Sequence, residues 1–167
     1  MKDVAELLSY AFALEVEAGQ RYAELAELMR AHNNVEVAGI FAKMADIEKL
    51  HADHIRQLLM QHNAIDKPIP EFGWLSPEGP ETTDLGELQY LLTPHQALTL
   101  ALFNEQRACD FYRDIERDSM DAETRYFARE MLEEEKEHVA WIRNWLESFP
   151  EPEDGWDHDD DAPAIQD

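Results

Sequence analysis

The 167-residue sequence has a single cysteine, Cys109, and this scarcity excludes two classes of site. One thiol cannot form a disulfide within the chain, nor can it supply a four-cysteine zinc or iron–sulfur site. A chain without disulfides fits a reducing compartment, so we expect a cytoplasmic protein. The first residues carry acids within their apolar stretch and show no cleavage-site pattern, which predicts no signal peptide.

Basic residues are also scarce. The chain has 14 of them against 37 acidic residues, which gives a net charge of −23. Such a surface repels phosphate backbones and anionic lipid, so we expect no nucleic-acid partner and no membrane-surface role. No uninterrupted apolar run is long enough to span a bilayer. The apolar share of 44% is sufficient for the core of one globular domain.

Apolar residues recur in alternating steps of four and three, the spacing of a buried helix face, along four segments. These segments are residues 3–30, about 33–62, 94–117 and about 121–148. Asp3 is predicted to cap the first helix, and Thr93 the third, where a proline follows at the first helical position. Asn33 and Glu36 resemble a capping box at the start of the second helix.

Prolines and glycines interrupt residues 63–93, which we interpret as a long connection with a short helical piece at Leu85–Leu92. A connection of this length is expected where the chain crosses the length of a helical bundle. The predicted fold is therefore an all-α four-helix bundle over residues 1–150, with a long crossover between its second and third helices. Residues 151–167 have the composition of an acidic C-terminal tail.

A glutamate interrupts each of the four apolar rows at a position where a buried helix favours leucine. In the second and fourth helices a histidine follows three residues later, as Glu48-x-x-His51 and Glu135-x-x-His138. A buried carboxylate and imidazole are costly unless something satisfies them. Glu-x-x-His projecting into a helical bundle is one known way to hold a metal ion.

The two halves of the chain repeat the same pattern. Glu15 and Tyr22 in the first helix correspond to Glu105 and Tyr112 in the third, each pair seven residues apart. In an antiparallel hairpin, residues equidistant from the turn lie at one level. The midpoint of Glu15 and Glu48 falls at the turn that contains His32, and the midpoint of Glu105 and Glu135 falls at residue 120, so each hairpin brings its glutamates together.

Packing the two hairpins together would gather four carboxylates and two imidazoles. Four buried carboxylates repel one another, and two divalent cations would neutralise them. Oxygen and imidazole donors without thiolate suit iron, manganese or a mixed pair rather than structural zinc. The metal ligands predicted are Glu15, Glu48, His51, Glu105, Glu135 and His138.

From Asp3 to Ser148 this pattern resembles the ferritin-like di-iron carboxylate superfamily, most closely its rubrerythrin and bacterioferritin branch. The resemblance implies two iron ions bridged by Glu48 and Glu135, with one histidine on each iron. Glu15 and Glu105 would then be terminal ligands. Tyr22 and Tyr112 would donate hydrogen bonds to ligand carboxylates, and they are the candidate catalytic residues.

The resemblance implies an oxidoreductase that reacts its di-iron centre with hydrogen peroxide or dioxygen, or that oxidises ferrous iron. Two alternatives are an iron-storage or buffering protein and a non-catalytic bundle with a structural metal site. Family habit also implies a homodimer or larger oligomer.

Three departures from the family patterns bear on mechanism. The chain has no cysteine pairs of a rubredoxin domain, so electrons would come from an unknown donor or from ferrous iron itself. Ala108 stands where rubrerythrin has an extra glutamate. Lys49 stands where bacterioferritin has its haem-binding methionine, so no haem is expected.

Several of these residues also have simpler structural interpretations. Either Glu-x-x-His pair taken alone fits solvated or structural residues, and the tyrosines fit core residues with a bonded hydroxyl. Cys109 fits a small buried apolar residue. The glutamates off the apolar rows are expected to be surface charge; these are Glu17, Glu133, Glu134 and Glu137.

Overall fold

The computed structural model describes residues 3–64 and 93–150. Over these two ranges it has four α-helices and no strand: α1 (Val4–Ala31), α2 (Val35–Gln61), α4 (Pro94–Asp118) and α5 (Ala122–Ser148). The predicted all-α fold is confirmed, with every helix end within two residues of its predicted position. None of these helices is both long and apolar enough to cross a membrane. The predicted helical piece at Leu85–Leu92 and the acidic tail 151–167 lie outside the described residues.

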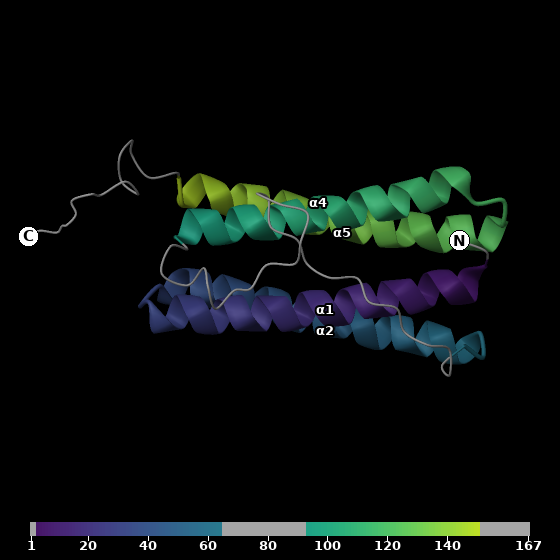
Figure 1. Cartoon of the computed structure of the whole chain (residues 1–167), viewed down its shortest axis with the longest axis horizontal. Coiled ribbons are helices and arrows are strands. Elements are labelled where there is room, and N and C mark those ends of the chain that lie inside the picture. The colour runs from purple at the N-terminus through teal and green to yellow at the C-terminus, as the bar shows by residue number, and fades with distance from the viewer. Residues whose placement is uncertain (1–2, 65–92, 151–167) are drawn as a thin grey trace, which may run out of the picture.

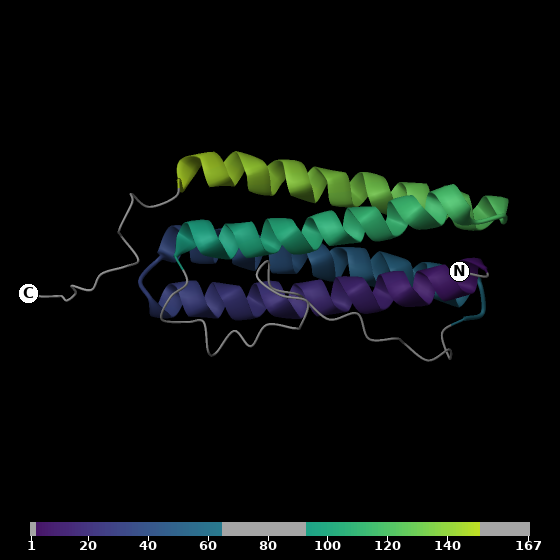
Figure 2. The ribbon, with the colours of Figure 1, turned by 45° about the horizontal axis from the view of Figure 1, so that its top comes forward.

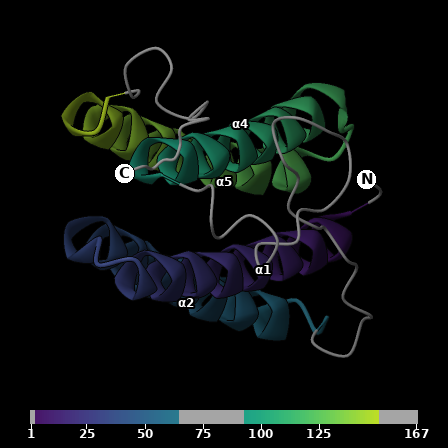
Figure 3. The ribbon, with the colours of Figure 1, turned by 60° about the vertical axis from the view of Figure 1, so that its left-hand side comes forward.

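The helices form two antiparallel hairpins, one of α1 and α2 and the other of α4 and α5 (Figure 1). The hairpins lie one above the other as two layers (Figures 1 and 3), and in the view of Figure 2 the ribbon of α4 passes in front of α2. α2 ends at the opposite end of the bundle from the start of α4 (Figure 1). Residues 62–93 therefore connect opposite ends, as the predicted crossover requires.

The caps explain where the helices begin. The Asp3 carboxylate accepts a hydrogen bond from the backbone of the first turn of α1, and Thr93 forms a complete capping box at α4. The predicted capping box of Asn33 and Glu36 is wrong. Asn33 has a φ of 63° and belongs to the turn that reverses the chain, so the N-cap of α2 is Asn34, whose side chain makes no capping hydrogen bond.

The apolar core consists of two clusters, one toward each end of the bundle. In α1, Leu14 belongs to the first cluster and Ala18 to the second, and Glu15 lies between them. In α4, Glu105 likewise separates Ala101 from Ala108. The predicted ligands thus occupy a polar layer in the middle of the bundle, with apolar packing on both sides.

Candidate metal centre

All four helices contribute a buried glutamate to this middle layer. Glu15, Glu48, Glu105 and Glu135 are each at most 3% exposed, although charged side chains are rarely buried so completely without partners. Each lies on the apolar row of its helix, and that row faces the core because residues three and four apart share one face.

His138 of α5 lies at the centre of this layer. Its Nδ1 atom is 3.2 Å from Glu105 Oε1, 3.2 Å from Glu48 Oε2 and 3.3 Å from Glu135 Oε1. The three carboxylates come from three different helices, and His138 itself is 1% exposed. One imidazole therefore connects α2, α4 and α5.

His51 of α2 lies at the edge of the layer. Its Nδ1 atom is 3.6 Å from Glu48 Oε1 and 3.8 Å from Glu15 Oε1. Its ring stacks on that of His138, with centroids 5.1 Å apart and planes 4° apart. The structure thus brings all six predicted ligands into one cluster.

Burial and mutual repulsion shift the pKa values of the four glutamates. Burial, with the charge of Glu105, raises the pKa of Glu48 to about 7, and burial with neighbouring carboxylates raises the pKa values of Glu15 and Glu135. For Glu105, burial is outweighed by hydrogen bonds, first of all from His138, which lower its pKa to about 2. The same carboxylates raise the pKa of His138, so Glu105 and His138 form a buried ion pair.

The two candidate catalytic tyrosines differ. The Tyr22 hydroxyl donates a hydrogen bond to Glu105 Oε2, across the interface between the hairpins. Tyr112 is just as completely buried, but its hydroxyl has no hydrogen-bond partner among the described residues, so the expected bond to a carboxylate is not present. Burial, with the charges of Glu15 and Glu135, raises its pKa. Its hydroxyl is therefore a protonated donor close to carboxylates that it does not reach.

The remaining buried atoms test whether metal ions fit this cluster. Within the described residues, several ligand atoms lack a hydrogen-bond partner: both oxygens of Glu15 and Glu135, Oε1 of Glu48, Nδ1 of His51 and Nε2 of His138. Buried polar atoms normally have partners, and each one left without a partner costs free energy. Divalent cations bound to these oxygens and nitrogens would satisfy them. The residues therefore fit the pair of metal ions that the sequence predicts.

The ligand atoms also have suitable spacing. Two groups have donor atoms within 4.8 Å of one another: Glu48 with His51 and His138, and Glu48 with Glu105, Glu135 and His138. Glu48 belongs to both groups, as a carboxylate between two ions would. Glu15 belongs to neither, and its Oε1 atom lies 3.8 Å from His51 Nδ1. Carboxylate and imidazole donors without a thiolate suit iron or manganese.

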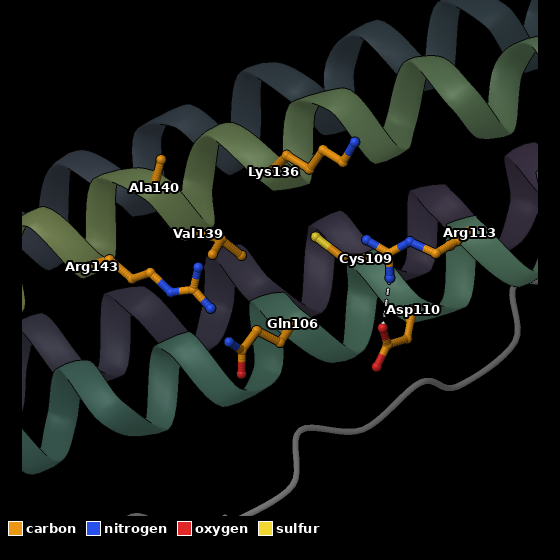
Figure 4. A pocket seen from close by; sticks show the side chains of 8 residues that line it. All are labelled: Gln106, Cys109, Asp110, Arg113, Lys136, Val139, Ala140 and Arg143. Atoms are coloured by element: carbon orange, nitrogen blue, oxygen red, sulfur yellow. Dashed lines mark hydrogen bonds and ion pairs between the residues drawn. The ribbon is translucent and has the colours of Figure 1, made fainter.

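Cys109 is not part of the cluster. It is buried, and burial raises the pKa of its thiol to about 11, which keeps it protonated. It faces a groove of about 450 Å³ on the outer side of α4 and α5 (Figure 4). The groove is lined by Gln106, Cys109, Asp110, Arg113, Lys136, Val139, Ala140 and Arg143. Since none of the six predicted ligands lines it, we assign this groove no part in the metal chemistry.

One acidic neighbour of the cluster was not predicted. Glu134 was expected to be surface charge, but its Oε1 atom lies 3.9 Å from His51 Nδ1, and its side chain is only 36% exposed. The signal available in the sequence was its position four residues before His138, which places both side chains on one face of α5.

Comparisons with known proteins agree with this geometry. The family model described as Rubrerythrin matches residues 6–70, which include α1 and α2. A solved structure of an uncharacterized conserved protein from Magnetospirillum magnetotacticum MS-1 is 35% identical in sequence, with a TM-score of 0.75. The match covers 90% of this chain and 98% of that one.

The chain belongs to the rubrerythrin family of ferritin-like proteins. None of the curated proteins matches it. The rubrerythrin match includes Glu15, Glu48 and His51, and the solved relative extends the similarity over both hairpins. Rubrerythrins are di-iron proteins, and the buried carboxylate and histidine cluster is the candidate site for those ions.

Proposed function

We propose that the chain is a di-iron carboxylate oxidoreductase that reacts with hydrogen peroxide or dioxygen, or oxidises ferrous iron. The observation that carries this proposal is the cluster of four buried glutamates and two histidines, several of whose ligand atoms have no hydrogen-bond partner among the described residues. A structural ion pair would leave no such set of unpartnered atoms. Family membership supports the same chemistry.

In this proposal the carboxylates of Glu15, Glu48, Glu105 and Glu135 would hold the two ions. The imidazoles of His51 and His138 would be the nitrogen ligands. When bound, two ferrous ions would supply two electrons, which together with two protons from solvent reduce hydrogen peroxide to two molecules of water. The ions could be iron, manganese or one of each, since the donor set suits both metals.

The chain's own residues create the environment for this chemistry. The two apolar clusters limit the access of water from either end of the bundle. Tyr22 orients Glu105 through its hydrogen bond, which would keep that carboxylate in position as metal binds. Ala108 supplies no further carboxylate at the position of the extra rubrerythrin glutamate, so ligand exchange of that kind is not part of the proposal.

The test is metal content and reactivity. Metal-loaded protein should contain two ions per chain, and the ferrous form should consume hydrogen peroxide or dioxygen in stopped-flow mixing. Glu48→Ala and Glu135→Ala should abolish binding of the pair, whereas the exposed residue Glu137 provides a matched control, Glu137→Ala.

Three outcomes would reject parts of this proposal. If Glu48→Ala still binds two ions, the ligand assignment is wrong. If the ferrous protein consumes neither oxidant, the site is structural. If the protein assembles into a large hollow oligomer carrying many irons per chain, its function is storage; a dimer on size-exclusion chromatography excludes storage.

A further inference from the structure

Of the six predicted ligands, all of which lie in the described ranges 3–64 and 93–150, His51 is the one with substantial exposure to solvent. The His51 side chain is 23% exposed, whereas none of the other five predicted ligands is more than 4% exposed. The apolar clusters cover the layer toward both ends of the bundle. An ion coming from solvent therefore has its shortest described route at His51.

Glu134 lies on the outer side of His51. Its Oε1 atom is 3.9 Å from His51 Nδ1, and two sealed carboxylates, Glu15 and Glu48, lie 3.8 and 3.6 Å from the same nitrogen. The imidazole thus stands between one carboxylate that solvent reaches and two that it does not. Within the described part of the chain, neither this nitrogen nor the fully buried Glu15 oxygens have a hydrogen-bond partner.

The fold holds Glu134 in this position. It lies four residues before His138 on α5, so both side chains face α2, and the His138 ring stacks on His51. On the next turn of the same face, the Trp141 ring lies 5.3 Å from the His138 ring. The solvent-exposed His51 therefore has the Glu134 carboxylate beside it, which attracts a cation, whereas His138 packs against an aromatic ring.

We propose that Glu134 and His51 form an admission site, which binds a divalent cation from solvent and passes it inward to Glu15 and Glu48. This inference rests on the proposed di-metal function. The net charge of −23 concentrates cations near the surface without directing them to any one point. Losing all bound water at once is costly for an ion. Because Glu134 is partly exposed and lies beside His51, an ion can exchange its bound water molecules for these protein ligands one at a time.

The experiment follows loading of metal-free protein with Co²⁺ by stopped-flow visible absorption. Glu134→Gln should slow the uptake by about tenfold, at the lower end of the rate enhancement expected from focused charge, and should still reach two ions per chain. Glu137→Gln makes the same charge change on an exposed position of the same helix and should load at the wild-type rate. Glu134→Asp should recover part of the lost rate.

Three results would overturn the proposal. If Glu134→Gln takes up Co²⁺ as fast as wild type, Glu134 has no role in uptake. If Glu134→Gln and Glu137→Gln are slowed by the same factor, Glu134 has no specific role. A final content below two ions in Glu134→Gln would make Glu134 a permanent ligand instead. Failure of the di-metal function itself is distinguishable, because the wild-type protein would then bind fewer than two ions.

Discussion

The imidazole rings of His51 and His138 lie face to face, with planes 4° apart, although they come from different halves of the chain. Their surroundings differ sharply. The Nδ1 atom of His138 has three carboxylates within 3.3 Å in a sealed environment, whereas His51 is partly open to solvent and its nearest carboxylate is 3.6 Å away. Two histidines with matching positions in the sequence repeat therefore have different surroundings.

This difference predicts different effects of their substitution on metal-free protein. His138→Gln removes the cation of a buried ion pair and should lower the free energy of unfolding by about 3 kcal/mol or more. His51→Gln should cost about 1 kcal/mol or less, because exposed pairs are weak. Urea unfolding in the presence of chelator measures both. Equal losses for the two variants would contradict the distinct roles.

The two tyrosines give a second matched pair. Tyr22→Phe removes a buried hydrogen bond to a charged carboxylate and should destabilise the metal-free protein by about 2 kcal/mol. Tyr112→Phe removes a buried hydroxyl that has no described partner, so stability should stay the same or rise slightly. Chemical denaturation measures the free energy of unfolding of both variants. A loss of stability in Tyr112→Phe as large as in Tyr22→Phe would show that the Tyr112 hydroxyl has an acceptor.

The pKa shifts predict that metal-free protein becomes less stable as pH rises. A carboxyl group with a raised pKa binds more protons in the folded state than in the unfolded one between the two pKa values, so stability falls across that interval. For Glu48 the interval runs from 4.5 to about 7, which corresponds to a loss of up to about 3 kcal/mol. The raised pKa values of Glu15 and Glu135 act in the same direction, as does that of His138 above 6.5.

Urea midpoints with chelator, measured between about pH 5 and about pH 7.5, test this sign. Glu48→Gln should flatten the dependence, and Glu137→Gln should leave it unchanged. Added Mn²⁺ or Fe²⁺ should stabilise the protein more at the higher pH, because metal competes with protons for the same carboxylates. A metal-free protein that is more stable at pH 7.5 than at pH 5 would contradict the burial of these acids.

The helix caps give a prediction that is independent of metal. Thr93→Ala removes both the side-chain cap of α4 and its capping box, and should cost about 1 kcal/mol of stability. Asn34→Ala should cost less, because the Asn34 side chain makes no capping hydrogen bond at α2. Thermal or chemical unfolding of the two variants ranks them, and a larger loss for Asn34→Ala would be the opposite of what the contacts imply.

The sequence by itself determined the helices and the four buried glutamates. Helical periodicity is local, so the steps of four and three place Glu15, Glu48, Glu105 and Glu135 on core-facing rows whatever the packing. The distances of these residues from the two turns also placed the glutamates of each hairpin at one level. The misassigned capping box at Asn33 was a failure of the same local reasoning, because a left-handed turn residue and an N-cap favour the same amino acid.

Only the tertiary structure decided how the two halves differ. The sequence repeat treats Tyr22 and Tyr112 as equivalent, and likewise His51 and His138, but the packing of one hairpin on the other gives Tyr22 an acceptor and seals only His138. It also brings Glu134 of α5 close to His51 of α2. Contacts between residues more than 80 positions apart depend on the relative placement of two rigid hairpins, which no local pattern specifies.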